Sequence, residues 1–244
     1  MLSFASIVQH GLFLFLLVVA PAWDFYDTRR LKNNPTSVRR LAYYRALCAW
    51  LWIAAIVACV TVGWRAIFTI SAAPAEASWL FGTAWVRYVV MAVLVLFAAA
   101  VAITYLQVAW MRLSQQPRRY ASSELMHKKV SYAYLFPTTW TERRWWVAIG
   151  LTAGICEETL FRGFLLQYLH GSPWQFGLTT ALVLSSVIFG LQHLYQDAQG
   201  TVASAVLGFL FALLFLLSGN LLLPIVLHAA LDLRLLAILR PPAE

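Results

Sequence analysis

Two adjacent carboxylates and an arginine interrupt an otherwise apolar stretch, GLTAGICEETLFRGFLLQ at residues 150–167. On membrane-insertion scales each such charge costs roughly 2.5–3.5 kcal/mol near the bilayer centre unless it is paired or hydrated. In a helix, Glu158 and Arg162 are i and i+4 neighbours in the order that favours an ion pair, whereas Glu157 lies about 140° around the helix from the arginine. We therefore expect Glu158 and Arg162 to support a site and Glu157 to be available for chemistry. The alternative is one buried ionic cluster that only fixes helix packing.

Two later apolar segments carry groups that could act with Glu157. SSVIFGLQHLYQ contains His193, and LLLPIVLHAALDL places His228 and Asp232 at i and i+4 on one helix face. A carboxylate and an imidazole can hold and deprotonate a water, and a second imidazole can stabilise the oxyanion that forms when this water attacks a carbonyl. These groups suit amide hydrolysis. The chain has no HExxH zinc-peptidase motif and no GxSx serine paired with a later helix histidine.

Two variants of this chemistry use residues of the same region. A zinc ion held by Glu157, His193 and His228 could activate the water, since ligands on separate helices need no fixed spacing; the preferred hypothesis requires no metal or other cofactor. Cys156 adjoins Glu157 and could be a nucleophile, although a thiol in apolar surroundings has low reactivity. The cysteines show no disulfide or metal-finger spacing and are expected to be packing residues: Cys48, Cys59 and Cys156.

The composition places these groups in a membrane protein. The 244-residue chain is 61% hydrophobic and 11% charged, with a mean hydropathy of +0.72. These values exclude an ordinary soluble domain. The net charge of +8 comes largely from basic residues grouped between apolar segments, the pattern that positive-inside topology produces. We infer no nucleic-acid function from it.

The apolar segments predict an all-α, polytopic transmembrane helical bundle of about seven spans. These are expected at about 5–22, 48–63, 85–111, 145–170, 174–194, 201–217 and 221–239. The first has no basic n-region and no clean cleavage site, so we expect a retained span and not a signal peptide. Gly150 and Gly154 form a GxxxG spacing that allows a neighbouring helix to approach closely.

The basic segments determine the predicted orientation. Residues 23–45 and 112–144 are expected to be cytoplasmic, with the N-terminus outside and the C-terminal RPPAE in the cytoplasm. The predicted location is therefore a cell inner membrane. Trp64, Trp79 and Trp85 are expected at the outer interface. The stretch 120–146 either lies on the inner membrane surface through its tyrosines and tryptophans or only tethers two spans.

The polar groups are unevenly distributed along the chain. No polar residue is expected at mid-membrane depth in the first half, and no inverted repeat relates the two halves. We predict an N-terminal three-span accessory part at 1–141, with basic cytoplasmic loops, and a catalytic helical core at 142–244.

Three motifs resemble those of the CPBP family, which includes CAAX prenyl proteases, bacteriocin-processing proteins and abortive-infection proteins. EETLFR at 157–162, FGLQH at 189–193 and HAALD at 228–232 agree in order and spacing, and the resemblance covers roughly 142–239. It implies a helical membrane bundle with a cavity open toward the cytosol and a glutamic endopeptidase activity on a membrane-associated protein or peptide. The implied site residues are Glu157 and His193 for water activation, His228 and Asp232 for the oxyanion, and Glu158 and Arg162 in support.

Two details of the motifs need explanation. Asp232 stands where the prenyl-protease branch typically has Asn, and an ionised Asp cannot donate a hydrogen bond to an oxyanion. Either Asp232 is protonated or, as we prefer, it orients His228 by accepting a hydrogen bond. Counted at about 1.5 Å per residue, Glu157 and His228 lie roughly 16–18 Å from the predicted cytoplasmic helix ends, but His193 lies near its end. The fifth helix must continue past Tyr195, be displaced along its axis or tilt strongly.

Two other function classes use the same groups. Buried Glu, His and Asp side chains could form a proton or ion relay in a proton-coupled carrier, although the missing repeat and the lack of paired broken helices argue against it. A non-catalytic membrane scaffold or immunity protein would instead bind a partner in the bilayer. The expected partners are membrane lipid and a membrane-associated peptide or protein, and not nucleic acid.

Overall fold

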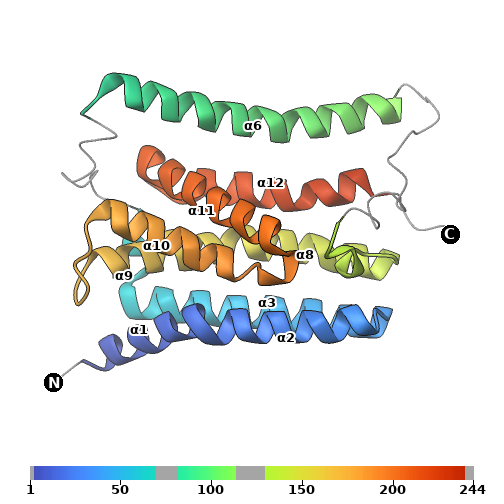
Figure 1. Cartoon of the computed structure of the whole chain (residues 1–244), viewed down its shortest axis with the longest axis horizontal. Helices are drawn as coiled ribbons and strands as arrows, with labels where there is room; N and C mark the ends of the chain where they lie inside the picture. Colours follow the sequence, from blue (N-terminus) through green and yellow to red (C-terminus); the bar gives the residue numbers. More distant parts are fainter. Residues whose placement is uncertain (1–2, 70–81, 114–129, 240–244) are drawn as a thin grey trace.

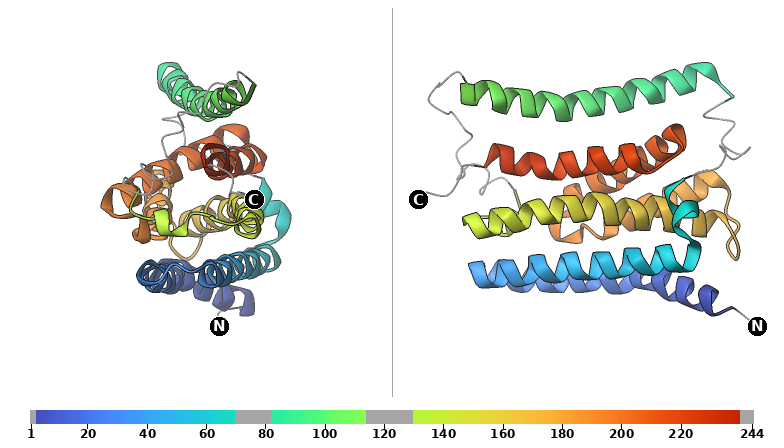
Figure 2. Two further views of the ribbon diagram at one scale, coloured as in Figure 1. Left: turned by 90° about the vertical axis from the view of Figure 1, so that its right-hand side faces the viewer. Right: turned by 180° about the vertical axis from the view of Figure 1, so that it is seen from behind.

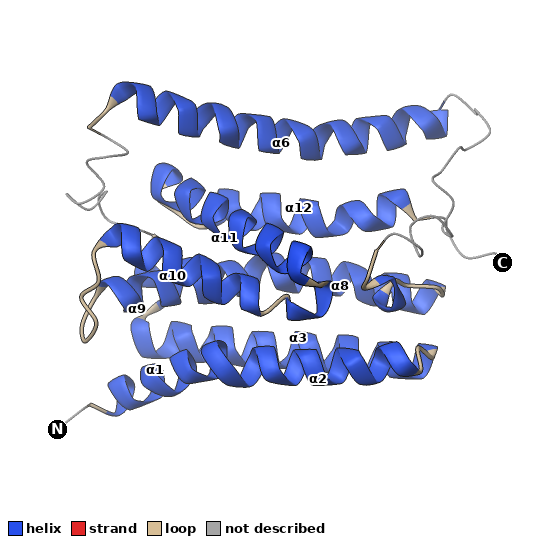
Figure 3. Cartoon of the chain, viewed as in Figure 1, coloured by secondary structure: helices blue, strands red, loops and turns tan. Residues whose placement is uncertain are grey.

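The computed structural model describes residues 3–69, 82–113 and 130–239. In these ranges the chain is helical apart from short links and one isolated bridge between Thr69 and Asn220 (Figure 3). The all-α prediction is confirmed. The elements are α1 (Phe4–Leu14), η1 (Phe15–Val19), α2 (Ala20–Asn33), α3 (Ser37–Val62), α4 (Trp64–Phe68), α6 (Ala84–Leu113), η3 (Ala133–Leu135), α8 (Trp140–Glu158), η4 (Thr159–Leu165), α9 (Leu166–His170), α10 (Leu178–Leu191), η5 (Leu194–Gln196), α11 (Ala198–Ser218) and α12 (Leu222–Ile238).

Each stretch predicted as a span contains a helix. By length and composition, four helices of the described residues can cross a membrane: Phe4–Asn33, Ser37–Val62, Ala84–Trp110 and Ala198–Ser218. The helix of Trp140–His170 carries the motif charges, and α10 is short at 14 residues. The exact number of spans and the orientation of the termini stay predictions. Three predicted features lie outside the described residues: Trp79, residues 120–129 of the stretch 120–146, and the C-terminal RPPAE.

The first basic segment is helical and not the loop that its charges suggested. The first helix continues through α2 to Asn33, and α3 begins at Ser37 after the threonine cap Thr36, whose side chain accepts a hydrogen bond from the Arg39 amide. The helices α2 and α3 are separated only by the link Asn34–Thr36, where Pro35 prevents one continuous helix. As a result, Asp24 and Arg40 are buried side chains and not loop charges.

The helices form layers (Figures 1 and 2). The helices α1, α2 and α3 lie on one face of α8, and α6 lies beyond α12 on the opposite face. Tyr105 of α6 donates a hydrogen bond to the Ala230 carbonyl of α12 at 2.6 Å. The first three predicted spans are therefore divided between two faces of the C-terminal helices. The boundary at residue 141 stays a prediction.

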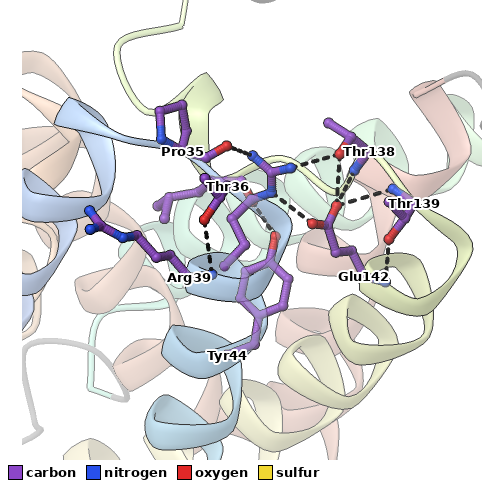
Figure 4. A network of polar contacts seen from close by, with 9 residues as sticks. Pro35, Thr36, Arg39, Tyr44, Thr138, Thr139 and Glu142 are labelled. Atoms are coloured by element: carbon purple, nitrogen blue, oxygen red, sulfur yellow. Dashed lines mark hydrogen bonds and ion pairs between the residues drawn. The ribbon is translucent and has the colours of Figure 1, made fainter.

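The long helix Trp140–His170 is fixed at its start by a polar network that Figure 4 shows. Thr139 caps α8 in a capping box with Glu142. Glu142 is fully buried and accepts a hydrogen bond from Nε of Arg40 at 3.0 Å. Nη1 of the same arginine donates to the Pro35 carbonyl at 2.7 Å. This network joins the start of α3 to the start of α8.

Glycines allow close approach between α8 and α12, as the GxxxG spacing predicted. A Cβ on Gly154 would lie 2.9 Å from the Ala229 Cβ, and one on Gly150 would lie 2.9 Å from the Leu233 side chain. After Glu158 the helix widens into the π-helical turn η4. Such turns are frequent at functional sites. The two motif-bearing helices α8 and α12 are therefore in direct backbone proximity.

The short length of α10 explains why His193 lies near the end of its predicted span. Its 14 residues span about 21 Å, less than the roughly 30 Å of a hydrocarbon core. In Figure 1 it begins near the end of α9 and stops part-way along α8. The helix does not continue past Tyr195, because α10 ends at Leu191 and the chain turns through η5. His193 thus lies in the turn that follows α10, and of the three alternatives the continuation of this helix past Tyr195 was wrong.

Candidate active site

Glu158 and Arg162 form the buried ion pair that their spacing predicted. Their side chains are 0% and 2% exposed, and Oε1 of Glu158 lies 3.1 Å from Nη1 of Arg162. Nη2 of the arginine also donates to the Gly208 carbonyl at 2.9 Å. The guanidinium lies over the rings of Phe189 and Phe211, 4.5 and 5.4 Å from their centroids. The buried guanidinium of Arg162 thus contacts α8, α10 and α11 from its position in η4.

His228 is attached to the same carboxylate. Its Nδ1 lies 2.7 Å from Oε1 of Glu158. Because an ionised carboxylate only accepts hydrogen bonds, Nδ1 carries the proton. The Phe211 ring stacks on the imidazole, with centroids 5.0 Å apart and planes at 14°. Both contacts fix the ring and leave Nε2 as the ring nitrogen that does not contact Glu158.

Two more carboxylates lie on the Nε2 side of His228. Oε2 of Glu157 is 3.9 Å from Nε2, and Oδ2 of Asp232 is 3.7 Å from it. Both distances exceed a hydrogen bond. The hydrogen bond that we expected from Asp232 to orient His228 is made by Glu158 instead, since the helix crossing at Gly154 brings the two residues together.

Within the described ranges, Glu157 differs from Glu158 in having no arginine partner. Its side chain is 16% exposed, and its Oε2 atom is buried with no hydrogen-bond partner among the described residues. Arg162 pairs with the neighbouring Glu158 and not with Glu157. The structure therefore separates the two glutamates as the helix geometry predicted.

His193 lies in the turn after α10. Its Nδ1 is 3.0 Å from the Phe189 carbonyl oxygen. A carbonyl can only accept, so Nδ1 donates and Nε2 is left with a lone pair. The Phe189 ring packs on both histidines, with centroids 5.0 Å from His193 and 6.0 Å from His228. In the motif FGLQH, the phenylalanine thus positions the histidine through its backbone and its ring.

A cavity of about 670 Å³ brings the predicted residues together. Glu157, His193, His228 and Asp232 all line it. Along α8 its lining runs from Glu157 to Trp146, about 16 Å at the helical rise, and along α12 it reaches Ile238, the last residue of that helix. The cavity therefore connects the buried glutamate with the bundle end at which α8 begins.

Residues 139–234 match the family model described as type II CAAX prenyl endopeptidase Rce1-like. This segment is an Rce1-like domain. No curated protein and no solved structure gives a significant match.

The Rce1-like domain agrees with the resemblance to the CPBP family. It begins at the Thr139 cap of α8 and ends on α12 just beyond Asp232, so it contains all three motifs. Together with the apolar helices, it supports an integral membrane endopeptidase that acts on a peptide or protein.

Sequence reasoning missed several residues around the Rce1-like site. Asp24 and Tyr43, from α2 and α3, line a second, small cavity together with Glu157 and His193. Asp24 was placed in a loop because arginines follow it. Phe211 was missed because nothing in its spacing distinguishes it from the other phenylalanines of α11.

Two alternatives from the sequence analysis were a zinc site and a cysteine nucleophile. In the parts of the chain that the structure describes, no three His, Cys, Asp or Glu side chains are arranged to hold one metal ion. Zinc bound by Glu157, His193 and His228 is a question for metal analysis of the purified protein. Cys156 is fully buried and outside both cavity linings, which argues for packing.

Proposed function

We propose that the chain is a glutamic-type, CAAX-protease-like endopeptidase that hydrolyses a peptide bond of a membrane-associated protein or peptide. The observation that carries the proposal is the state of Glu157. It is a carboxylate with one buried, unpartnered oxygen, on the wall of a cavity shared with His193 and His228. A carboxylate that only stabilised packing would be expected to have its own cation, as Glu158 has.

The first step assigned to this site is attack by water. Glu157 and His193 hold a water between them, and its oxygen attacks the carbonyl carbon of the scissile bond while its proton moves to Glu157 or to Nε2 of His193. The Nδ1 hydrogen bond of His193 to the Phe189 carbonyl supports this role, because it leaves Nε2 as an acceptor.

The second step is stabilisation and collapse of the tetrahedral oxyanion. When Nε2 of His228 carries a proton, it can donate to the oxyanion, and Glu158 at Nδ1 supplies the compensating negative charge. Asp232 lies 3.7 Å from the same nitrogen, so it is placed to attract that N–H before the oxyanion forms. Cleavage of the C–N bond then returns the proton to the leaving amine.

The cavity suits a partly apolar substrate. Aromatic side chains from several elements line it, among them Tyr44, Tyr132, Phe136, Trp146 and Phe211. Its reach to the end of α12 gives a path from the bundle end at which α3 and α8 begin with their arginines. We infer that a substrate segment enters from the cytoplasmic side of a cell inner membrane, with the N-terminus outside and the C-terminus inside.

The test is cleavage by purified protein in proteoliposomes. The substrates are a prenylated CAAX peptide and a library of membrane-active peptides, with and without a metal chelator, and His193→Ala is the matched inactive variant. We expect chelator-resistant cleavage by the wild type and at least a 100-fold loss in the variant. Loss of cleavage with chelator and its return with zinc would establish the metal variant. No cleavage by well-folded protein would favour a scaffold, and proton flux after a pH jump would favour a carrier.

A further inference from the structure

A second cavity of about 50 Å³ lies next to Glu157 and His193. The rest of its lining combines polar side chains from the N-terminal helices and the turn after α10 with apolar and aromatic ones. The polar residues are Asp24, Tyr43, Gln192 and Tyr195, and the others are Leu47, Trp50, Leu51 and Phe161. A cavity of this size with these polar groups can hold a few ordered waters, because one water needs about 10–15 Å³ of cavity volume and two to four polar partners. We call it the water chamber.

Asp24 is the least expected member of the water chamber. It is 5% exposed and comes from α2, a helix that carries none of the three motifs. Oδ1 accepts a hydrogen bond from the Tyr43 hydroxyl at 2.6 Å, and no cation pairs with the carboxylate among the described residues. A buried, unpaired carboxylate in a membrane helix is costly and marks a functional site more often than packing.

Packing between α2 and α3 does not require this charge. The Trp23 and Tyr43 rings already stack, with centroids 6.1 Å apart and planes at 12°. The contact between α2 and α3 therefore does not explain the negative charge of Asp24, which lines the water chamber.

We propose that Asp24 and Tyr43 are positioning residues that hold water in the chamber and orient it for Glu157 and His193. The proposal rests on the proposed function and gives the N-terminal helices a part in the same site. Asp24 accepts a hydrogen bond from the water, while the water's other hydrogen faces Glu157 or His193. On attack, that proton moves to one of these two bases and the Asp24 carboxylate is unchanged.

The first experiment separates kcat from KM. Asp24→Asn keeps an oxygen that can accept from Tyr43 but removes the negative charge, and Tyr43→Phe removes the hydroxyl. The matched control is Asp27→Asn, the same charge change one turn along α2 and outside both cavity linings. We expect Asp24→Asn and Tyr43→Phe to lower kcat by about 10- to 100-fold with KM changed less than about 3-fold. Asp27→Asn should stay within about 2-fold of the wild type in both constants.

The second experiment measures water without relying on activity. Hydroxyl-radical footprinting in proteoliposomes reports water beside Trp50, which lines the water chamber and not the larger cavity, whereas Tyr43 and Tyr195 line both. We expect labelling of Trp50 in the wild type and its loss in Asp24→Leu, with Asp27→Leu labelled like the wild type. If the wild type is labelled but cuts no peptide, the proposed function fails while the water chamber stands. Unlabelled wild-type Trp50, or an Asp24→Asn variant with unchanged kcat, would overturn the proposal.

Discussion

Arg162→Met should destabilise the protein more than an ordinary core substitution. The methionine fills much of the volume of the arginine stem, so the main change is electrostatic. It removes the 3.1 Å ion pair with Glu158, the 2.9 Å hydrogen bond to Gly208 and the contacts with the two phenylalanine rings. Glu158 is left as a fully buried carboxylate with His228 as its hydrogen-bond partner.

The expected loss in unfolding free energy is about 3–5 kcal/mol, because removing one partner of a buried pair leaves an uncompensated charge. This corresponds to a change in the unfolding equilibrium constant of roughly 100-fold to several thousand-fold. It can be measured by reversible unfolding in mixed detergent micelles at increasing mole fractions of sodium dodecyl sulfate. Arg39→Met, at an exposed arginine of α3, should change stability by about 0.5 kcal/mol or less.

A double variant tests the cause. Glu158→Gln keeps an oxygen that can accept from His228 but removes the charge, so Glu158→Gln with Arg162→Met removes both charges of the pair. We expect it to be less destabilised than the sum of the single variants by about 1–3 kcal/mol. An Arg162→Met loss below about 1 kcal/mol, or simple additivity of the two changes, would refute the description of a buried, coupled pair.

Two further predictions concern the position of α8. Gly154→Val should lower kcat at least about 10-fold and reduce the melting temperature, because the valine side chain would lie where the Ala229 backbone packs. The control Gly11→Ala should match the wild type, because an added Cβ at Gly11 would have no neighbouring atom within 4 Å. At the start of α8, burial acts to raise the pKa of Glu142, but hydrogen bonds from the preceding loop and Arg40 outweigh it, so its pKa lies below the ordinary value. The stabilisation from ionised Glu142 is therefore complete above the ordinary glutamate pKa and is lost as the pH falls through the lowered pKa of the folded state. Melting temperatures measured from pH 7 to pH 3 should depend less on pH in Glu142→Gln than in the wild type. Equal pH dependence of the two proteins would contradict a lowered pKa for Glu142.

The local features of the site could be predicted from the sequence because they depend on helix geometry alone. The i, i+4 spacing of Glu158 and Arg162 fixes which glutamate is paired, and the glycine spacing at Gly150 and Gly154 indicates a close helix crossing. Both are properties of one helix. They hold whatever the neighbouring elements do.

The contacts between distant elements could not be predicted in the same way. The hydrogen bond from His228 to Glu158 depends on the register of α12 against α8, which no single helix specifies. The depth of His193 depends on α10 ending at Leu191, inside the bundle. Asp24 was assigned to a loop because charge was read as exposure, whereas α2 continues the first helix and carries this residue into the core.

The measurement that tests the central claim most directly compares Glu157→Gln with Glu158→Gln at matched folded yield. Cleavage of the best proteoliposome substrate is followed under single-turnover conditions, with substrate binding and melting temperature measured on the same samples. We expect Glu157→Gln to bind substrate and melt like the wild type while its cleavage rate falls at least about 1,000-fold. Glu158→Gln should lower the melting temperature and retain more activity than Glu157→Gln. An active Glu157→Gln variant would contradict the assignment of Glu157 as the base that activates water.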